Sequence, residues 1–231
     1  MPRQRLHRFY VGDKLELTHD FWLHDERLVW QWRKVLRMAP GQELVLFDGI
    51  RSDRLYRLVE LNDREAHVQY VTDMERQVPA LEVYLLWSLL KKDKNDWVIQ
   101  KATELGASHL IPLLAERSEK LGFDTARAQR IAIEAAEQCG RSDVPSVRDL
   151  ITPEAAIHEL SSHVQLHICE QGNDTPLAAN GAVGVLVGPE GGWSAAEKQV
   201  FIDAGLPHIG LGSFTLRAET AAVIATSKIA P

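Results

Sequence analysis

Residues 185–194 read Val-Leu-Val-Gly-Pro-Glu-Gly-Gly-Trp-Ser. The apolar start predicts the end of a buried strand, and the capping-box pattern of Ser194–Glu197 predicts that a helix begins there. Gly188, Gly191 and Gly192 permit positive φ angles and let a ligand approach the backbone closely. A helix N-terminus adds free N–H groups and the positive end of a dipole. The stretch therefore predicts a strand-to-helix junction that is either a ligand site or a tight structural turn.

Residues 210–221 follow the same plan. They read Gly-Leu-Gly-Ser-Phe-Thr-Leu-Arg-Ala-Glu-Thr-Ala, so a strand end again passes through a glycine-bearing loop into a helix. Ligands of α/β sheets bind outside the carboxyl ends of strands, and two such loops in succession predict the walls of one crevice. Glu219 suits the positive end of the helix dipole and Arg217 does not. The two side chains are therefore either functional or a surface ion pair.

The chain is expected to change character near residue 75. Residues 1–75 are predicted to be β-rich, with one helix near 28–38, and short strands at such spacing suggest a small barrel. The predicted strands cover 8–11, 43–47, 55–61 and 66–71.

Residues 76–231 alternate strands with helices, which predicts βαβ units around a parallel sheet. Periodicity alone indicates an open doubly wound sheet, because knots are nearly absent from proteins. Strands are predicted over 81–90, 109–115, 165–169, 182–188 and 208–211, and helices over 123–139 and from residues 153, 195 and 218 onward.

Composition narrows the class of protein. Net charge is −6, yet residues 1–60 hold 11 Lys/Arg against 9 Asp/Glu, which indicates a polyanion-facing module or a solvated surface. Cys139 and Cys169 have no partner at metal-ligand spacing, which is typical of reduced thiols in a cytosolic protein. No segment approaches the roughly 18 consecutive apolar residues of a membrane span, and no apolar region follows the basic N-terminus as in a secretory signal.

Further motifs accompany the two loops along the chain. In order they are Arg8-Phe9-Tyr10, residues 35–42 (Val-Leu-Arg-Met-Ala-Pro-Gly-Gln), Phe47-Asp48-Gly49, Lys94 with residues 99–106 (Ile-Gln-Lys-Ala-Thr-Glu-Leu-Gly), and residues 137–141 (Glu-Gln-Cys-Gly-Arg) with Val144-Pro145. Together with the loops they resemble the RsmE family of 16S rRNA (uracil-N3)-methyltransferases, in the SPOUT (trefoil-knot) superfamily. The chain departs from the family pattern at Gln31, where a His is frequent, and at Cys169-Glu170-Gln171, which replaces His-Pro.

The resemblance implies the fold and the partners. It implies a C-terminal SPOUT α/β trefoil-knot domain over 76–231 and a small N-terminal PUA-like β-barrel domain over 1–75 that binds RNA. It also implies S-adenosylmethionine (SAM) as methyl donor, no metal, a cytoplasmic homodimer, and 16S rRNA as substrate, either free or in the assembled small subunit. Cofactor contacts are expected from Cys169, Glu170, Val187, Gly188, Gly191, Gly192, Leu211, Gly212 and Leu216.

The chemistry that the resemblance implies needs an anion stabiliser, a proton acceptor and RNA contacts. Uracil N3–H is a weak acid, so the negative charge on the base must be stabilised as the proton leaves. Arg217 is the first candidate for this role and Arg141 the second, with a phosphate contact as the other role for Arg141. The carboxylates available to accept the proton are Glu219, Glu190 and Glu137. Phosphate contacts are expected from Arg5, Arg8, Arg33 and Arg37.

Three alternatives stay open at this point. The same scaffold could methylate a ribose 2′-OH or a tRNA base. The chain could also be a non-catalytic RNA-binding assembly factor. A nucleotide hydrolase is disfavoured, because no Gly-Lys-Ser/Thr follows the glycines of residues 188–192.

Overall fold

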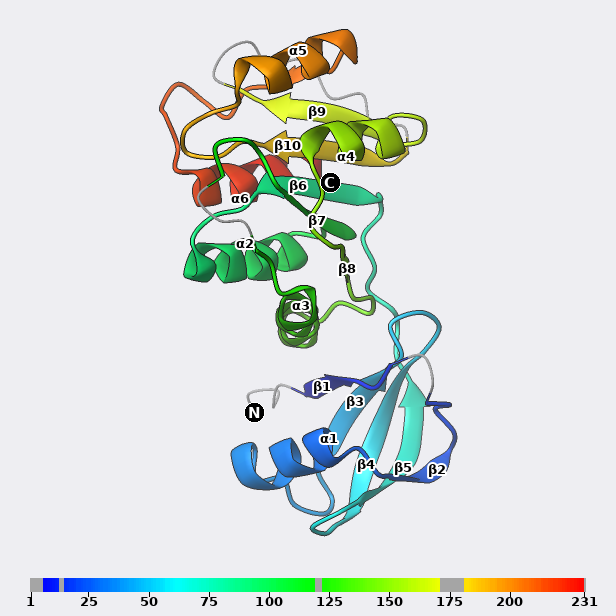
Figure 1. The fold of residues 1–231 in the computed structure, drawn as a ribbon. Helices are drawn as coiled ribbons and strands as arrows, with labels where there is room; N and C mark the ends of the chain where they lie inside the picture. The colour runs from blue at the N-terminus through cyan, green and yellow to red at the C-terminus, as the bar shows by residue number, and fades with distance from the viewer. Residues whose placement is uncertain (1–5, 13–14, 119–121, 171–180, 231) are drawn as a thin grey trace. The chain divides into compact units, whose positions relative to one another are not determined.

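The computed structural model describes residues 6–12, 15–118, 122–170 and 181–230. The chain divides into two compact units (Figure 1). The first comprises Met1–Val78 and Ala136–Asp143, and the second Pro79–Ala135 and Val144–Pro231. The division after Val78 lies three residues beyond the boundary that we predicted at residue 75. The return of Ala136–Asp143 to the first unit was not predicted.

The first unit is built on a five-stranded sheet. Its strands lie in the order β1-β3-β4-β5-β2, with β1 parallel to β3 and the other pairs antiparallel. The bounds are β1 His7–Tyr10, β2 Asp20–Leu23, β3 Glu43–Phe47, β4 Asp53–Leu61 and β5 Ala66–Asp73. The edge strand β2, with the sequence Asp-Phe-Trp-Leu, was not predicted.

A short helical segment covers the core of this sheet. The segment consists of α1 (Glu26–Trp30) and a π-helical turn, η1 (Gln31–Val35). It buries Leu28, Val29 and Trp32 against strand residues of the same core, among them Phe9, Leu44, Leu46, Tyr56 and Leu58. The predicted single helix near 28–38 is therefore partly wrong, because the chain widens into a π turn after Trp30.

Asp53 is the buried polar centre of the first unit. Its side chain is fully buried, ion-paired with Arg8, and accepts a hydrogen bond from the Ser142 hydroxyl at 2.7 Å. Ser142 also accepts from the Gln77 backbone N–H at 2.8 Å, and Glu137 accepts from the Tyr10 backbone N–H at 2.8 Å. These bonds explain why the 136–143 segment belongs to this unit.

The second unit contains a six-stranded, fully parallel sheet. The strand order is β11-β9-β10-β6-β7-β8. The bounds are β6 Val83–Ser88, β7 His109–Leu113, β8 Ser146–Val147, β9 Gln165–Cys169, β10 Val183–Val187 and β11 His208–Ile209. Strands β6 and β10 are buried on both faces, as their continuous apolar sequences require.

Helices cover both faces of the parallel sheet (Figure 1). Helices α2, α3 and α6 pack in one apolar cluster with Val83, Leu85 and Val185, while α4 and α5 pack in the other with Leu86 and Leu186. The bounds are α2 Lys92–Glu104, α3 Thr125–Cys139, α4 Pro153–Leu160, α5 Ala195–Asp203 and α6 Ala218–Ile229. None of the helices within the described ranges is long and apolar enough to cross a membrane.

Local signals place the helix ends where the sequence predicted them. The Ser194 hydroxyl accepts from the Glu197 N–H at 3.2 Å, and the Glu197 carboxylate accepts from the Ser194 N–H at 2.7 Å, which completes the capping box. The Thr152 hydroxyl caps α4 by accepting from the Ala155 N–H at 3.2 Å, with Pro153 as the first residue of the helix. Gly140 follows the last turn of α3 with a φ of 92°, a conformation that favours glycine.

Candidate active site

A pocket of about 490 Å³ opens at the carboxyl ends of β9, β10 and β11 in the second unit. Because Ile209 is paired with Cys169 and Leu186 with Ile168, these three strands end at the same level. The lining residues are Cys169, Glu170, Val187, Gly188, Pro189, Glu190, Gly192, Trp193, Lys198, Leu211, Gly212, Phe214, Thr215, Leu216, Ala218 and Ala221. The two glycine-bearing loops thus form walls of one crevice, as their sequences predicted.

The loop between β10 and α5 forms the first wall. A Cβ at Gly188 would lie 3.0 Å from the indole of Trp193, so only glycine lets the loop close over that ring. Trp193 is buried, and within the described residues its Nε1 has no hydrogen-bond partner. Gly192 has a φ of 68°, and its N–H donates to the Pro189 carbonyl at 2.8 Å. The loop is a tight turn with one unpaired buried donor beside the pocket.

The loop between β11 and α6 forms the second wall. Gly212 has a φ of 107° and lies in the wall with Leu211 and Leu216. Arg217 occupies the N-cap position of α6 with extended backbone and makes no side-chain capping bond. Its side chain is exposed and does not line the pocket.

The end of β9 supplies the third wall. Glu170 is ion-paired with Lys198 at 3.2 Å, and its carboxylate also lies 3.3 Å from Nδ1 of His208. Burial raises the pKa of the Cys169 thiol to about 12, against an opposing effect of the Lys228 charge. Cys169 is therefore a neutral thiol at physiological pH and serves as an apolar wall rather than a nucleophile.

Lys94 of α2 connects the two loops. Its ammonium lies 2.9 Å from a carboxylate oxygen of Glu190, in the first loop, and 3.1 Å from one of Glu219, in the first turn of α6. The bond to Glu190 and then that to Glu219 raise the pKa of Lys94. Burial pushes the pKa of Glu219 upward, but its own backbone N–H and Lys94 outweigh this, so the pKa lies below its usual value. Lys94 and Glu219 are therefore both charged at neutral pH, and the one ammonium contacts two carboxylates.

Eight of the nine residues predicted to contact the cofactor line the pocket. The exception is Gly191, whose carbonyl accepts from Arg117 at 2.9 Å and whose Cα faces the same side chain. Of the predicted catalytic residues, Glu190 lines the pocket, while Glu219 does not and is linked to Glu190 through Lys94. Seven further residues line the pocket without having been predicted to do so, and all of them except Lys198 lie in the two glycine-bearing stretches: Pro189, Trp193, Lys198, Phe214, Thr215, Ala218 and Ala221.

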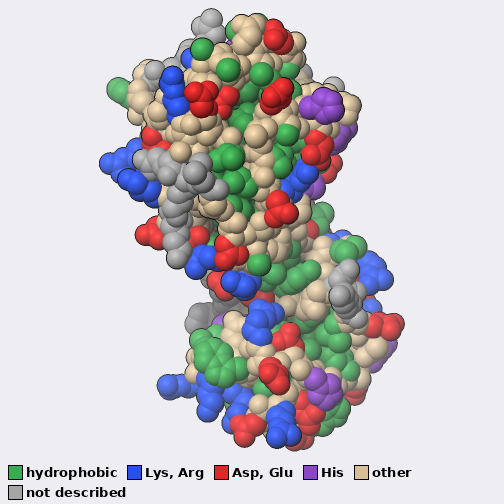
Figure 2. Space-filling view, in the orientation of Figure 1, with side chains coloured by type: hydrophobic (Ala, Val, Ile, Leu, Met, Phe, Trp, Pro, Cys, Tyr) green, Lys and Arg blue, Asp and Glu red, His purple; other side chains and the backbone are tan. Residues whose placement is uncertain are grey.

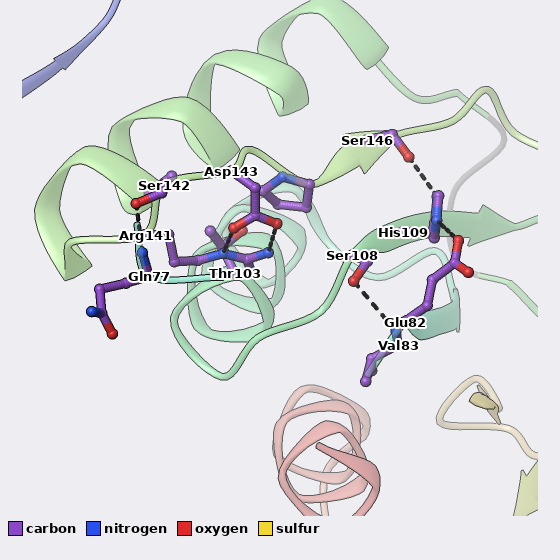
Figure 3. Close-up of polar contacts among 12 residues, drawn as sticks. Gln77, Glu82, Val83, Thr103, Ser108, His109, Arg141, Ser142, Asp143 and Ser146 are labelled. Atoms are coloured by element: carbon purple, nitrogen blue, oxygen red, sulfur yellow. Dashed lines mark hydrogen bonds and ion pairs between the residues drawn. The ribbon is translucent and has the colours of Figure 1, made fainter. Parts of the chain in front are cut away.

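Arg141, the second candidate for anion stabilisation, belongs to the first unit and is not among the lining residues. Its side chain is buried, and its Nε and one Nη donate to the two carboxylate oxygens of Asp143 at 3.0 and 2.6 Å (Figure 3). This bidentate pair occupies the guanidinium edge that would otherwise face an anion. Glu137, a candidate proton acceptor, also lies in the first unit and accepts from the Tyr10 N–H.

The four arginines expected to contact RNA have different environments. Arg5 lies outside the described residues. Arg8 is 14% exposed, ion-paired with buried Asp53, and donates to the Arg141 carbonyl at 3.1 Å. Arg33 is ion-paired with Asp63, and Arg37 is exposed. The structure therefore gives Arg8 a role in folding and leaves Arg37 the most accessible of the three that it describes.

A second polar cluster lies at the amino ends of the parallel strands. His109 is held between Glu82 and the Ser146 hydroxyl, each 2.7 Å from a ring nitrogen (Figure 3), and stacks on Tyr84 at 4.1 Å. Hydrogen bonds from Tyr84 and His109 lower the pKa of Glu82. These partners satisfy one another, so the cluster fits a structural role.

The pocket fits the methyl donor that the resemblance implies. Its volume suits a ligand of that size, since pockets for small organic molecules span about 300–1,000 Å³. Val187, Leu211, Leu216 and Ala221 offer apolar surface, and three glycines, Gly188, Gly192 and Gly212, bring main-chain atoms into the lining. The unpaired Trp193 Nε1 is a further polar group in this wall.

Comparison with known proteins identifies the family. Residues 77–230, more than half of the chain, match the model of an RNA methyltransferase domain. The chain is 32% identical to ribosomal RNA small subunit methyltransferase E of Bacillus subtilis, covering 84% of each protein, and 31% identical to that of Aquifex aeolicus, covering 82% of this chain and 86% of the relative. The crystal structure of the Neisseria gonorrhoeae protein of the same name, bound to S-adenosylmethionine, superposes with a TM-score of 0.87, 30% identity and 97% coverage of both chains. These neighbours confirm the predicted SPOUT-type α/β fold with an N-terminal β domain. The chain belongs to the RNA methyltransferase family and, within it, to the RsmE group that its motifs predicted.

Proposed function

We propose that this protein methylates N3 of a uridine in 16S rRNA, with S-adenosylmethionine as the methyl donor. The observation that carries the proposal is the pocket at the ends of β9, β10 and β11, built from the two family loops. The 30%-identical relative whose structure contains S-adenosylmethionine spans nearly the whole chain, which supports the same ligand here.

Binding of the donor falls to main-chain atoms and small side chains. Backbone groups around Val187, Gly188 and Gly192 face Leu211 and Leu216 across the pocket and would hold the donor between them. When bound, S-adenosylmethionine supplies a methyl group already activated by its sulfonium charge. The protein must therefore position the uracil, accept its N3 proton and stabilise the resulting anion.

Glu190 and Arg217 are assigned the two chemical roles. Glu190 lines the pocket, so its carboxylate is better placed than that of Glu219 to accept the N3 proton. Arg217 precedes α6 at the pocket rim, between the lining residues Leu216 and Ala218, with an exposed side chain. A guanidinium there can stabilise negative charge on uracil O2 or O4. Arg141 is not given this role, because Asp143 holds its guanidinium.

The substrate is 16S rRNA, alone or within the small subunit, and the active form is a homodimer in the cytoplasm, as in the family that the chain resembles. The first unit contacts RNA phosphates through Arg33 and Arg37. The target uridine must leave any stack to enter the pocket, which costs a few kcal/mol and favours an unpaired site.

The experiment is modification mapping of small-subunit rRNA in a strain that lacks this protein. We expect one 3-methyluridine to be missing and to return when the wild-type gene is supplied, but not when the Arg217→Ala gene is supplied. An unchanged set of modified uridines would contradict the proposal. Loss of a ribose 2′-O-methyl group instead would assign the enzyme to a different reaction on the same scaffold.

A further inference from the structure

The outer face of the α1–η1 segment carries an exposed tryptophan. Trp30 is 61% exposed, whereas its neighbours Leu28, Val29 and Trp32 are at most 1% exposed and form the core contact. No ring in the described part of the chain stacks on Trp30, whereas exposed Trp22 already stacks on His67 at 4.9 Å. The indole of Trp30 is thus a large flat apolar surface with a free face.

The π turn sets which side chains accompany this indole. The Leu36 N–H donates to the Gln31 carbonyl at 3.0 Å, so each turn here contains more residues than in an α-helix. Residues four or five positions apart therefore share a face, which places Lys34 and Val35 beside Trp30. Lys34 and Val35 are both exposed. Single π turns of this type are frequent at functional sites.

The same segment is strongly basic in an acidic protein. Residues 26–37 contain four Lys/Arg and one Asp/Glu, although the whole chain has a net charge of −6. Figure 2 shows Lys and Arg side chains gathered at the lower left of the first unit, near the helical segment labelled in Figure 1. Arg33 is ion-paired with Asp63, and Arg27 donates to the Tyr10 carbonyl at 3.3 Å while staying exposed.

Arg37, at the end of the segment, has an unfavourable backbone conformation. Its φ of 52° is the one positive value among non-glycine residues of the described ranges. The left-handed conformation costs an L-residue energy that glycine would avoid, and such strain is concentrated at functional sites. An exposed arginine at this position presents a cation to solvent at the end of the same segment.

We propose that this stacking face, defined as Arg27, Trp30, Lys34 and Arg37, binds single-stranded RNA, with Trp30 stacked on an unpaired base. Proteins commonly hold unpaired nucleotides with an aromatic ring flanked by cations. The ring stacks on the flat face of a base, and the cations contact the phosphates of the backbone. A protein partner would favour a wider apolar patch with few charges at its centre. The inference rests on the proposed function in that it takes RNA as the ligand.

The test is binding of full-length protein to a short fluorescent oligouridylate, compared with an RNA duplex of equal length. Trp30→Ala should weaken binding of the single strand by roughly 5- to 150-fold, the range reported by alanine substitution at base-stacking aromatics. Trp30→Tyr should restore most of the affinity, and Trp22→Ala, on a ring that is already stacked, should leave it unchanged. In a plot of the logarithm of the RNA association constant against the logarithm of the salt concentration, Lys34→Gln and Arg37→Gln should each reduce the magnitude of the slope by about 0.7, the value for one lost phosphate contact on a single strand.

The outcomes separate this inference from the proposed function. Unchanged binding by Trp30→Ala, or equal weakening for the duplex, would overturn the stacking role while leaving methyl transfer intact. A change in the oligomeric state of Trp30→Ala in sedimentation, without a change in RNA affinity, would instead make this face a contact between copies of the chain. Calorimetric binding of S-adenosylmethionine should be the same in all these variants, and its absence in the wild type would count against the proposed function alone.

Discussion

Arg217 occupies a position that helix physics does not favour. It caps the N-terminus of α6 without a side-chain capping bond, and a cation there meets the positive end of the helix dipole. A serine or aspartate would stabilise the helix better, by about 0.5–2 kcal/mol relative to a side chain that does not cap. The residue is therefore better explained by the reaction at the pocket rim than by the stability of α6.

Replacing Arg217 tests this explanation. Arg217→Ala should reduce kcat for methyl transfer at least about 100-fold, the loss typical of removing one anion-stabilising donor, with little change in donor affinity. Arg130→Ala is the control. It removes an exposed arginine of α3, away from the pocket lining, and should behave as wild type. Single-turnover kinetics would measure both, and near-normal turnover in Arg217→Ala would exclude the residue from the chemistry.

Cys169 provides a second test at the residue scale. Since burial raises its pKa to about 12, the thiolate is scarce below that pH, whereas Cys139 is exposed. Iodoacetamide should therefore modify Cys139 first and leave Cys169 largely unmodified at pH 8, as peptide mass spectrometry can show. Preferential labelling of Cys169 at pH 8 would mean that the wall of the pocket is open to water.

At the scale of elements, Lys94 joins three pieces of the second unit. It extends from α2 to the β10–α5 loop through Glu190 and to α6 through Glu219. The folded pKa of Glu219 lies below the unfolded value, so its contribution to stability is present above about pH 4.5 and is lost as pH falls through the folded pKa. The linkage should accordingly be intact at neutral pH and weaken only in acid.

Removing the ammonium should loosen both walls of the pocket. Lys94→Met should weaken binding of S-adenosylmethionine by roughly 2- to 30-fold, the range for mutations that act on a ligand through intervening structure. Lys94→Arg should recover part of the loss. Lys101→Met is the matched control, because Lys101 lies on the same helix and pairs only with Glu104 among the contacts described. Equal donor affinity in Lys94→Met and wild type, measured by calorimetry, would show that the loops do not depend on this linkage.

Elements with a local signal were predictable, and those decided by distant contacts were not. The capping box at Ser194, the Thr152-Pro153 start and the glycine after α3 each act within a few residues, so the sequence alone reveals them. The π turn at Gln31–Val35 depends on how Trp32 packs in the core, which periodicity does not report. Lys94 was noted only as part of a motif, since nothing nearby in sequence indicates that Glu190 and Glu219 meet it.

At the scale of the whole molecule, the same distinction governs strand order and domains. Alternating strands and helices predicted a parallel sheet, but the order β11-β9-β10-β6-β7-β8 arises from crossovers that sequence spacing does not encode. The predicted open doubly wound arrangement was corrected by the resemblance, whose SPOUT fold class is confirmed. The return of Ala136–Asp143 to the first unit depends on buried Asp53, which has no local pattern.

The stability of the first unit should depend on that aspartate. Asp53→Ala would leave the guanidinium of Arg8, 14% exposed, without its carboxylate partner, and loss of one partner of a buried ion pair costs about 3–5 kcal/mol. Asp63→Ala removes the carboxylate that pairs with Arg33. Because the Asp63 side chain is 79% exposed, this change should cost no more than about 1 kcal/mol of stability. Urea unfolding would compare the two, and equal effects would contradict the role assigned to Asp53.

The most direct measurement is nucleoside mass spectrometry of small-subunit RNA, taken from a strain lacking this protein and incubated with purified protein and methyl-labelled S-adenosylmethionine. We predict that the label appears in 3-methyluridine at one site and that Arg217→Ala abolishes it. Label on a ribose or on another base, or no label with the wild-type protein, would contradict the account.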